Sequence, residues 1–158
     1  GVAETAEDVK RRWDEIKAEE RKQKGELEQT LLEKVPRSVP ALVEAQQLTA
    51  KAATVGFDWE NADQVVEKLH EELEEMAEAR RQGSREELEG ELGDLLFVLV
   101  NLARVLKVDA EQALRKTNAK FRQRFRYVEQ QLNQQGKPLT EASLEEMEAL
   151  WQEAKQRA

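Results

Sequence analysis

The stretch ELGDLLFVLVNLA, residues 91–103, decides the fold class. Between Leu92 and Ala103 the only charged residue is Asp94. A helix that is apolar nearly all round is buried on most sides. An ionised carboxylate in such surroundings costs several kcal/mol unless it is paired or binds a cation. The stretch therefore predicts a buried helix. Contact with water would not stabilise an ionised Asp94 in it, so this carboxylate needs another explanation.

Helix-forming residues dominate on both sides of this stretch. Leu, Glu, Ala, Gln, Lys and Arg fill the chain, whereas isoleucine occurs once, at Ile16. Ser84, Asp109 and Ser143 are each followed three residues later by Glu or Gln, which is the pattern of a capped helix start. These signals predict an all-α chain with a linker at 25–37 and helices at about 6–24, 38–55, 62–81, 84–107, 109–135 and 143–158.

Composition and charge exclude several functional classes. The 158 residues, 37% charged and 39% hydrophobic, suit one domain with a core. The net charge of -8 argues against a protein that grips polynucleotide phosphates. The absence of cysteine excludes a disulfide scaffold, a thiolate zinc site and a cysteine nucleophile. Since His70 is the only histidine, carboxylates are the main chemical resource.

The sequence carries no membrane or export signal. Its longest nearly uncharged run, residues 95–103, is far short of the ~20 residues that span a bilayer. No signal-peptide pattern opens the chain. We therefore expect a soluble, cytoplasmic protein without a membrane partner. Gly1 stands where an initiator methionine would, which indicates a processed or truncated chain.

The predicted helix at 62–81 separates two kinds of glutamate. At 100° per residue, Glu72 and Glu75 lie along the edge of the apolar face. Three neighbouring glutamates turn towards solvent instead: Glu71, Glu74 and Glu78. The apolar face, which we expect in the core, consists of Val65, Val66, Leu69, Leu73 and Met76.

The next helix supplies a second pair, Glu91 and Asp94, which are also three residues apart. The pair borders an apolar stripe expected in the core, formed by Leu88, Leu92, Leu95, Leu99 and Leu102. A short connection around Gly83 lets the two helices pack antiparallel, so the two carboxylate pairs can converge. Converging carboxylates repel one another unless hard cations neutralise them, and oxygen ligands suit Mg²⁺ or Mn²⁺. The alternative is that these are ordinary surface glutamates.

At these residues the chain resembles the MazG family of all-α nucleoside triphosphate pyrophosphohydrolases. The family motif is ExxE followed after a variable gap by ExxD, seen here as Glu72-Leu73-Glu74-Glu75, fifteen residues, and Glu91-Leu92-Gly93-Asp94. The segments VPRSVPALVEAQQLTAKAATVGFDW and NAKFRQRFRYVE resemble the C-terminal repeat of two-repeat MazG. The resemblance implies a charged helix and inter-repeat linker at 1–37, and a helical catalytic domain at 38–158. It also implies that an N-terminal repeat is missing.

The resemblance further implies an activity and a set of site residues. The activity is hydrolysis of a (deoxy)nucleoside triphosphate to the monophosphate and pyrophosphate, with Mg²⁺ and possible use of Mn²⁺. The fold would be an antiparallel bundle that forms a homo-oligomer, a dimer or a dimer of dimers. The metal ligands and catalytic carboxylates would be Glu72, Glu75, Glu91 and Asp94. The nucleotide contacts would be Lys68, Lys120, Arg124, Trp151 and Lys155, with Asn101 and Asn118 as further polar contributors.

Two ambiguities concern the chemistry of this site. Glu71 and Glu74 also satisfy ExxE, although the helical wheel and the family pattern both favour Glu72 and Glu75. Any carboxylate edge or bound water could accept the proton of the attacking water, and Glu75 is one candidate. The pairs Lys120–Arg124 and Trp151–Lys155 could instead belong to solvent-exposed helix faces. Trp151 could also be a core residue.

Two rival functions stay open at this point. A ferritin-like di-iron bundle would use Glu67 and His70 as an ExxH motif, but that chemistry needs two such motifs and the chain has one histidine. His70 also lies about 160° around the helix from Glu72, so we read it as a surface or interface residue. A non-enzymatic helical adaptor is the second rival, since long amphipathic helices suit subunit packing. A purely structural adaptor would not explain why the carboxylate of Asp94 stands within an apolar run.

Overall fold

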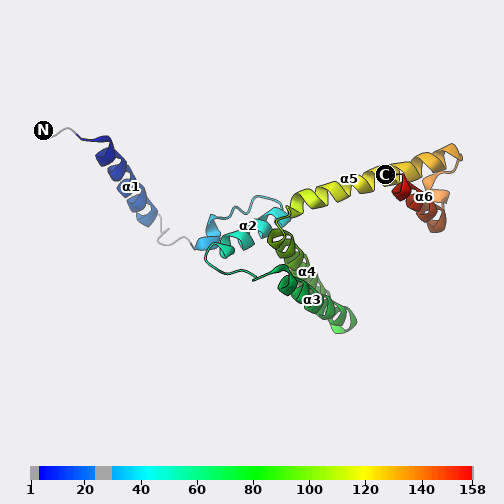
Figure 1. The fold of residues 1–158 in the computed structure, drawn as a ribbon, viewed down its shortest axis with the longest axis horizontal. Helices are drawn as coiled ribbons and strands as arrows, with labels where there is room; N and C mark the ends of the chain where they lie inside the picture. The colour runs from blue at the N-terminus through cyan, green and yellow to red at the C-terminus, as the bar shows by residue number, and fades with distance from the viewer. Residues whose placement is uncertain (1–3, 24–29, 158) are drawn as a thin grey trace. The chain divides into compact units, whose positions relative to one another are not determined.

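The computed structural model describes residues 4–23 and 30–157, and the described parts are helical without strands. The chain divides into two compact units, Gly1–Asp58 and Trp59–Ala158. The first unit holds α1 (Ala6–Gln23), a short 3₁₀ helix η1 (Leu31–Lys34) and α2 (Ala41–Ala53). The second holds α3 (Ala62–Gln82), α4 (Arg85–Val105), α5 (Ala110–Gln134), the 3₁₀ helix η2 (Leu139–Glu141) and α6 (Leu144–Gln156) (Figure 1). The all-α prediction is confirmed.

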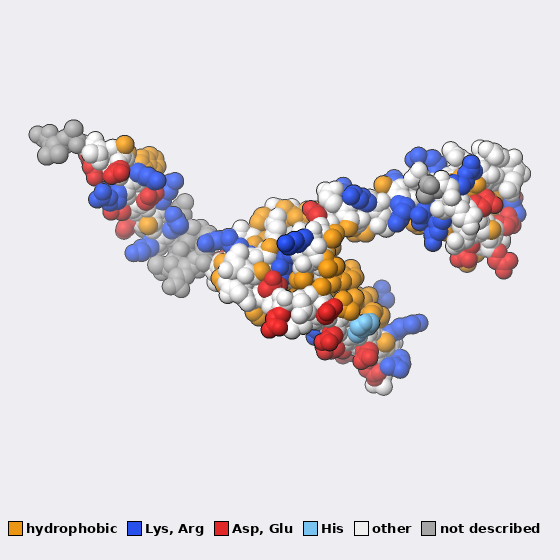
Figure 2. Space-filling model, in the orientation of Figure 1, with side chains coloured by type: hydrophobic (Ala, Val, Ile, Leu, Met, Phe, Trp, Pro, Cys, Tyr) orange, Lys and Arg blue, Asp and Glu red, His pale blue; other side chains and the backbone are white. Residues whose placement is uncertain are grey.

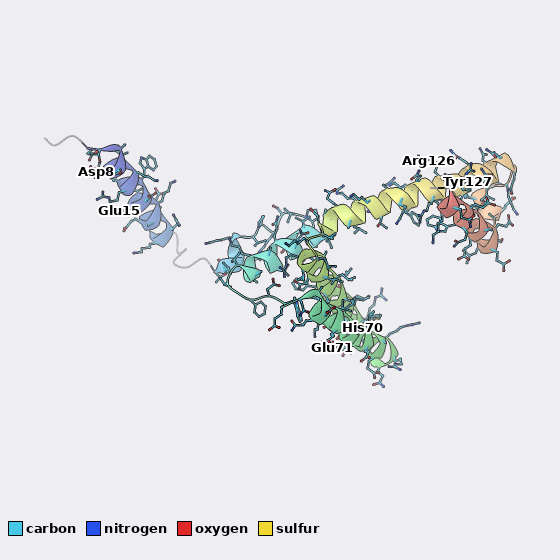
Figure 3. The ribbon with its side chains drawn as sticks, in the orientation of Figure 1. Asp8, Glu15, His70, Glu71, Arg126 and Tyr127 are labelled. Atoms are coloured by element: carbon cyan, nitrogen blue, oxygen red, sulfur yellow. The ribbon has the colours of Figure 1, made fainter. Side chains whose placement is uncertain are left out.

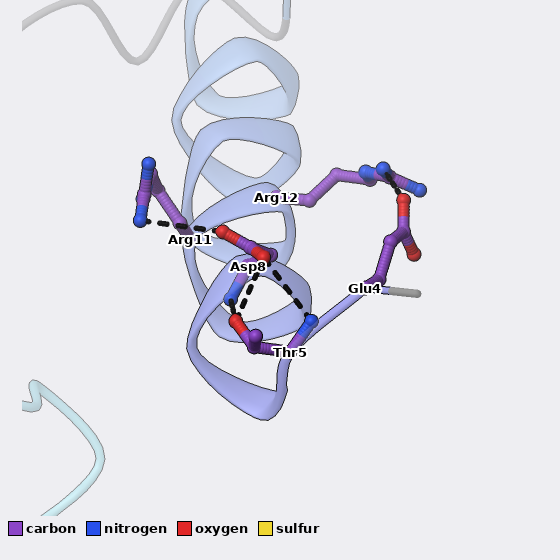
Figure 4. Close-up of polar contacts among 5 residues, drawn as sticks. All are labelled: Glu4, Thr5, Asp8, Arg11 and Arg12. Atoms are coloured by element: carbon purple, nitrogen blue, oxygen red, sulfur yellow. Dashed lines mark hydrogen bonds and ion pairs between the residues drawn. The ribbon is translucent and has the colours of Figure 1, made fainter. Parts of the chain in front are cut away.

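Helix α1 begins at a reciprocal cap. The backbone N–H of Asp8 donates to Thr5 Oγ1 at 3.2 Å, and the Thr5 N–H donates to Asp8 Oδ2 at 3.1 Å (Figure 4). The Thr5 hydroxyl also donates to this carboxylate, which holds the pKa of Asp8 below its usual range. Arg11 and Arg12 pair with Asp8 and Glu4 respectively. These bonds satisfy N–H groups that a helix start otherwise leaves without partners.

The first unit differs from the sequence prediction in three places. Pro40 is the N-cap of α2 rather than a residue inside the helix, and α2 ends at Ala53. Within the predicted linker, residues 31–34 form η1, which contacts α2. Gly1, the predicted helix end at Lys24 and the linker's first residues lie outside the described residues.

Helices α3 and α4 form an antiparallel hairpin that turns at Gly83 (Figure 1). The Glu87 N–H donates to Ser84 Oγ at 3.2 Å, so the predicted cap of α4 is confirmed. A Cβ at Gly83 would lie 2.6 Å from the backbone oxygen of Ala79, so the turn has no room for a side chain. The hairpin brings the predicted carboxylate pairs onto neighbouring helices.

Helices α5 and α6 form the second hairpin of this unit. Their starts are capped by Asp109 and Ser143, as the sequence predicts. Buried apolar side chains at Val128, Leu132 and Ala154 form the seam between them. Polar contacts also join the two arms of this hairpin. Lys137 Nζ lies 2.6 Å from Glu146 Oε1. The Tyr127 hydroxyl donates to Glu153 Oε2 at 3.0 Å and accepts from Arg157 Nη1 at 3.1 Å.

The predicted core stripes are only partly buried in the single chain. On α3, Val65 is fully buried, but Val66 and Leu73 are 37% and 40% exposed. On α4, Leu92 and Leu99 are each 44% exposed. Asp94 is exposed as well, so the expectation that α4 is buried on most sides is wrong for one copy of the chain. The reason is that one neighbouring helix can cover only one face of an apolar helix.

No helix in the part of the chain that the structure describes combines the length and apolar content needed to cross a bilayer.

Candidate metal centre

Three of the four predicted carboxylate ligands meet between α3 and α4. Glu72, Glu91 and Asp94 each offer an oxygen that lies within 4.8 Å of the other two. Antiparallel pairing explains how they meet. Glu72 and Asp94 each lie eleven residues from Gly83, which is about three helical turns, and therefore at the same level of the hairpin.

Glu72 is the most buried of the three. Its side chain is 7% exposed, and it is one of two buried residues on α3, the other being Val65 two turns earlier on the same face. Its Oε2 and the Oε2 of Glu91 are buried without a hydrogen-bond partner. Buried carboxylate oxygens without partners are costly. A divalent cation would satisfy them, so the donor set fits an oxygen-ligated ion such as Mg²⁺ or Mn²⁺.

The electrostatics of Glu91 support the same interpretation. Burial raises the pKa of Glu91 above its ordinary value, and the negative charges of Glu75, Glu72 and Asp94 raise it further. A cation bound at this cluster would offset the repulsion that the neighbouring negative charges exert on an ionised Glu91.

The overlapping ExxE registers on α3 differ in burial, although Lys68 contacts a glutamate of each. Its Nζ lies 3.2 Å from Glu72 Oε1 and 3.4 Å from Glu71 Oε2, and both contacts raise the pKa of Lys68. The Glu71 side chain is 64% exposed, and the neighbouring His70, labelled beside it in Figure 3, is exposed as well. Glu74 and Glu78 are exposed too, as the helical wheel predicts. Burial therefore favours the register that starts at Glu72.

Glu75 stands apart from the three-carboxylate group, although its charge acts on Glu91. It is exposed. Glu75 and Glu91 line one open pocket of about 450 Å³ that extends towards the hairpin turn. The rest of its lining consists of Glu78, Ala79, Gln82, Gly83 and Glu87. Glu75 is thus placed at the edge of the acidic cluster, facing open space rather than the buried seam.

The aromatic and cationic residues predicted on the later helices meet in part between α5 and α6. The Arg124 guanidinium carbon lies 5.9 Å from the centroid of the half-buried Trp151 ring. The predicted contacts Asn118, Lys120 and Lys155 are exposed on the same two helices. A cation over an indole is a favourable contact and leaves the guanidinium available to anions.

Two contacts at these predicted residues were not foreseen from the sequence. Phe121 lies 5.2 Å from Trp151 and stacks on Phe125 at 6.1 Å, although it is 58% exposed. The spacing of the two phenylalanines by four residues was the available signal. Asn101 is buried and its Oδ1 accepts a hydrogen bond from Arg104 at 3.2 Å, a pairing between neighbouring turns of α4.

Comparison with known proteins gives a family match over the helices that carry these carboxylates. The model of the MazG nucleotide pyrophosphohydrolase domain matches residues 60–128, a range that contains all four carboxylates. The nucleoside triphosphate pyrophosphohydrolase of Escherichia coli K12 is 46% identical over 155 residues, covering 97% of this chain and 58% of that protein.

Two further relatives are similar over most of the chain. The nucleoside triphosphate pyrophosphohydrolase/pyrophosphatase MazG of Thermotoga maritima is 41% identical over 92% of this chain and 54% of its own. The uncharacterized protein YabN of Bacillus subtilis is 45% identical over 94% of this chain and 30% of its own. The chain thus spans little more than half the length of the first two relatives.

Proposed function

Because the chain belongs to the MazG family, we propose that it hydrolyses (deoxy)nucleoside triphosphates to the nucleoside monophosphate and pyrophosphate, with Mg²⁺ as the cofactor and Mn²⁺ as a possible substitute. The observation that carries the proposal is the buried Glu72 carboxylate, whose Oε2 lacks a partner beside Glu91 and Asp94. Two relatives bear the name nucleoside triphosphate pyrophosphohydrolase, which supports the substrate class.

Glu72, Glu91 and Asp94 would hold the cation, with Glu75 completing the ligand set from the pocket edge. A divalent ion bound there supplies the positive charge that a triphosphate and a departing pyrophosphate need. Glu75 is also our candidate for the group that accepts the proton of the attacking water, because its exposed carboxylate faces open space.

The residues on α5 and α6 would bind the nucleotide. Arg124 and Lys120 lie one helical turn apart and would contact phosphates. Trp151, next to the Arg124 guanidinium, would offer a stacking surface for the base, and Lys155 lies one turn beyond it. The remaining proposed polar contacts are Lys68, Asn101 and Asn118.

We also propose that the working protein is a homo-oligomer, a dimer or a dimer of dimers. Figure 2 shows hydrophobic side chains along α4. The exposed fractions of its large apolar side chains are 44% for Leu92, 59% for Leu96, 41% for Phe97 and 44% for Leu99. A second copy would bury this face. Analytical ultracentrifugation tests the idea, since Leu96→Glu should shift the population towards monomer.

The domain division and location are proposals as well. Residues 1–37 would correspond to the inter-repeat segment and 38–158 to the catalytic domain. The domain match at 60–128 lies wholly within the second range. Because nucleoside triphosphates are made and used in the cytoplasm, that is where the activity would operate.

The activity is tested by magnesium-dependent pyrophosphate release from a mixture of nucleoside triphosphates. Glu72→Gln and Asp94→Asn should abolish release while leaving the helical content unchanged, because each removes a metal-binding charge at nearly constant volume. Glu71→Gln and Glu78→Gln are matched controls on the exposed side of α3 and should be nearly silent. Retained activity in the first two variants, or equal loss in the controls, would show that the site is wrongly placed.

No pyrophosphate release at micromolar enzyme would favour the alternative function, a non-enzymatic helical adaptor. The exposed apolar face of α4 is the observation that supports this second reading.

A further inference from the structure

Resting on the proposed function, we propose that Lys68 is a positioning residue, which holds one oxygen of Glu72 so that the other stays directed into the buried seam for the cation. The family resemblance implies a different role for Lys68, direct contact with the nucleotide. The two roles lead to different expectations for metal binding in the absence of nucleotide.

The contacts of Glu72 are unequal. Oε1 pairs with Lys68 Nζ at 3.2 Å, whereas Oε2 is buried without a partner. A carboxylate can rotate about its terminal torsion at little cost, since such torsions are broad. A contact to Oε1 is therefore what fixes where Oε2 points, and Lys68 is placed to provide it from the preceding helical turn.

Lys68 itself is held in place. Its side chain is 36% exposed, and its ammonium is shared between Glu72 and the exposed Glu71. This arrangement keeps the positive charge at the outer side of the Glu72 carboxylate, away from the unpartnered oxygen. A cation could thus bind Oε2 without displacing the lysine. Hydrogen-bonded partners of metal-ligating carboxylates orient them, and loss of such a partner lowers metal affinity by roughly 10–100-fold.

The sign of the effect separates orientation from charge. Removing a nearby positive charge should by itself tighten the binding of a divalent cation. Weaker binding after loss of Lys68 would therefore identify orientation of Glu72 as its contribution. If Lys68 only contacts the nucleotide, its loss should not weaken metal binding measured in the absence of nucleotide.

The experiment measures Mn²⁺ affinity of the full chain by electron paramagnetic resonance of free Mn²⁺, without nucleotide. The variants are Lys68→Met and Lys68→Gln, with Lys68→Arg as the conservative rescue and Glu74→Gln as the matched control, because Glu74 is exposed on the same helix. We expect binding to weaken roughly 10–100-fold in the Met and Gln variants. It should be largely retained with Arg and unchanged in Glu74→Gln. Thermal melting by circular dichroism checks that each variant is folded.

Unchanged or tighter Mn²⁺ binding in either the Met or the Gln variant would overturn the positioning role, as would a wild-type chain that binds no Mn²⁺. Pyrophosphate release is scored separately. If Lys68 variants weaken Mn²⁺ binding but the wild type releases no pyrophosphate, the positioning role stands and the proposed hydrolase activity fails. If hydrolysis is observed while Mn²⁺ affinity does not depend on Lys68, the activity stands and the positioning role fails.

Discussion

Two neighbouring valines on α3 allow the packing of the site helix to be tested quantitatively. Val65 is fully buried and Val66 is 37% exposed. Val65→Ala removes two methyl groups, worth about 0.8 kcal/mol each in transfer free energy, and leaves a cavity that adds to the loss. Alanine recovers roughly half a kcal/mol of helix propensity. We expect the free energy of unfolding to fall by about 2 kcal/mol, and the Tm by roughly 4–8 °C for a chain of this size.

Val66→Ala is the matched control, because it makes the same chemical change on the same helix and gains the same helix propensity. Its free energy of unfolding should change by less than about 0.5 kcal/mol, as is usual for surface substitutions. The assay is urea unfolding followed by far-ultraviolet circular dichroism, at one protein concentration and with EDTA present. Equal destabilisation by the two substitutions, or a larger effect at Val66, would refute the assignment of Val65 to the buried face.

Two further predictions concern the acidic cluster and the hairpin turn. Because the pKa of Glu91 is raised in the folded chain, its contribution to stability without divalent cations is greatest at low pH and is lost as pH rises through the folded pKa. Glu91→Gln should flatten that loss in Tm measurements against pH in EDTA, and an unchanged profile would contradict the raised pKa. Gly83→Ala should destabilise the chain by about 1–3 kcal/mol, because its Cβ would lie 2.6 Å from the Ala79 oxygen. Gly90→Ala, which meets nothing within 4 Å in mid-helix, should instead stabilise by roughly 0.5–1 kcal/mol, and similar urea midpoints for both variants would contradict the close approach.

Features fixed by local chemistry were predictable from the sequence. The starts of α4, α5 and α6 follow from Ser84, Asp109 and Ser143, because each cap side chain bonds to a backbone N–H only three residues away. The same reasoning missed the role of Pro40 at α2, where no side chain accepts the cap hydrogen bond. It also missed η1, whose four residues carry no distinct hydrophobic period.

Burial was harder to predict, because an apolar face does not say which molecule covers it. Leu92 and Leu99 lie on the stripe expected in the core, yet both are exposed in one copy of the chain. Helical periodicity identified a face that avoids water, but it carries no information on whether the chain itself or a second copy supplies the cover. The same limit led to the expectation that Asp94 is buried.

Spacing predicted that carboxylates of the two motifs converge, because the motifs lie on helices joined by a short turn. It placed Glu72 and Glu91 together, but the separation of Glu75 from the three-carboxylate group depends on the crossing of the helices, which spacing does not fix. The contact of Phe121 with Trp151 joins residues thirty positions apart, and no local pattern links them.

The placement of Gly83 midway between the two acidic motifs bears on which length changes the hairpin would tolerate. Glu75 and Glu91 are each eight residues from it, and Glu72 and Asp94 each eleven. One residue added to a single arm would shift every ligand beyond it by about 1.5 Å along the axis and turn it by about 100° relative to its counterparts. One residue added at the bend leaves both arms in step. Insertions and deletions that preserve cation binding should therefore occur at the turn around Gly83. A one-residue insertion or deletion within α3 or α4 should abolish cation binding, even where every acidic side chain is retained.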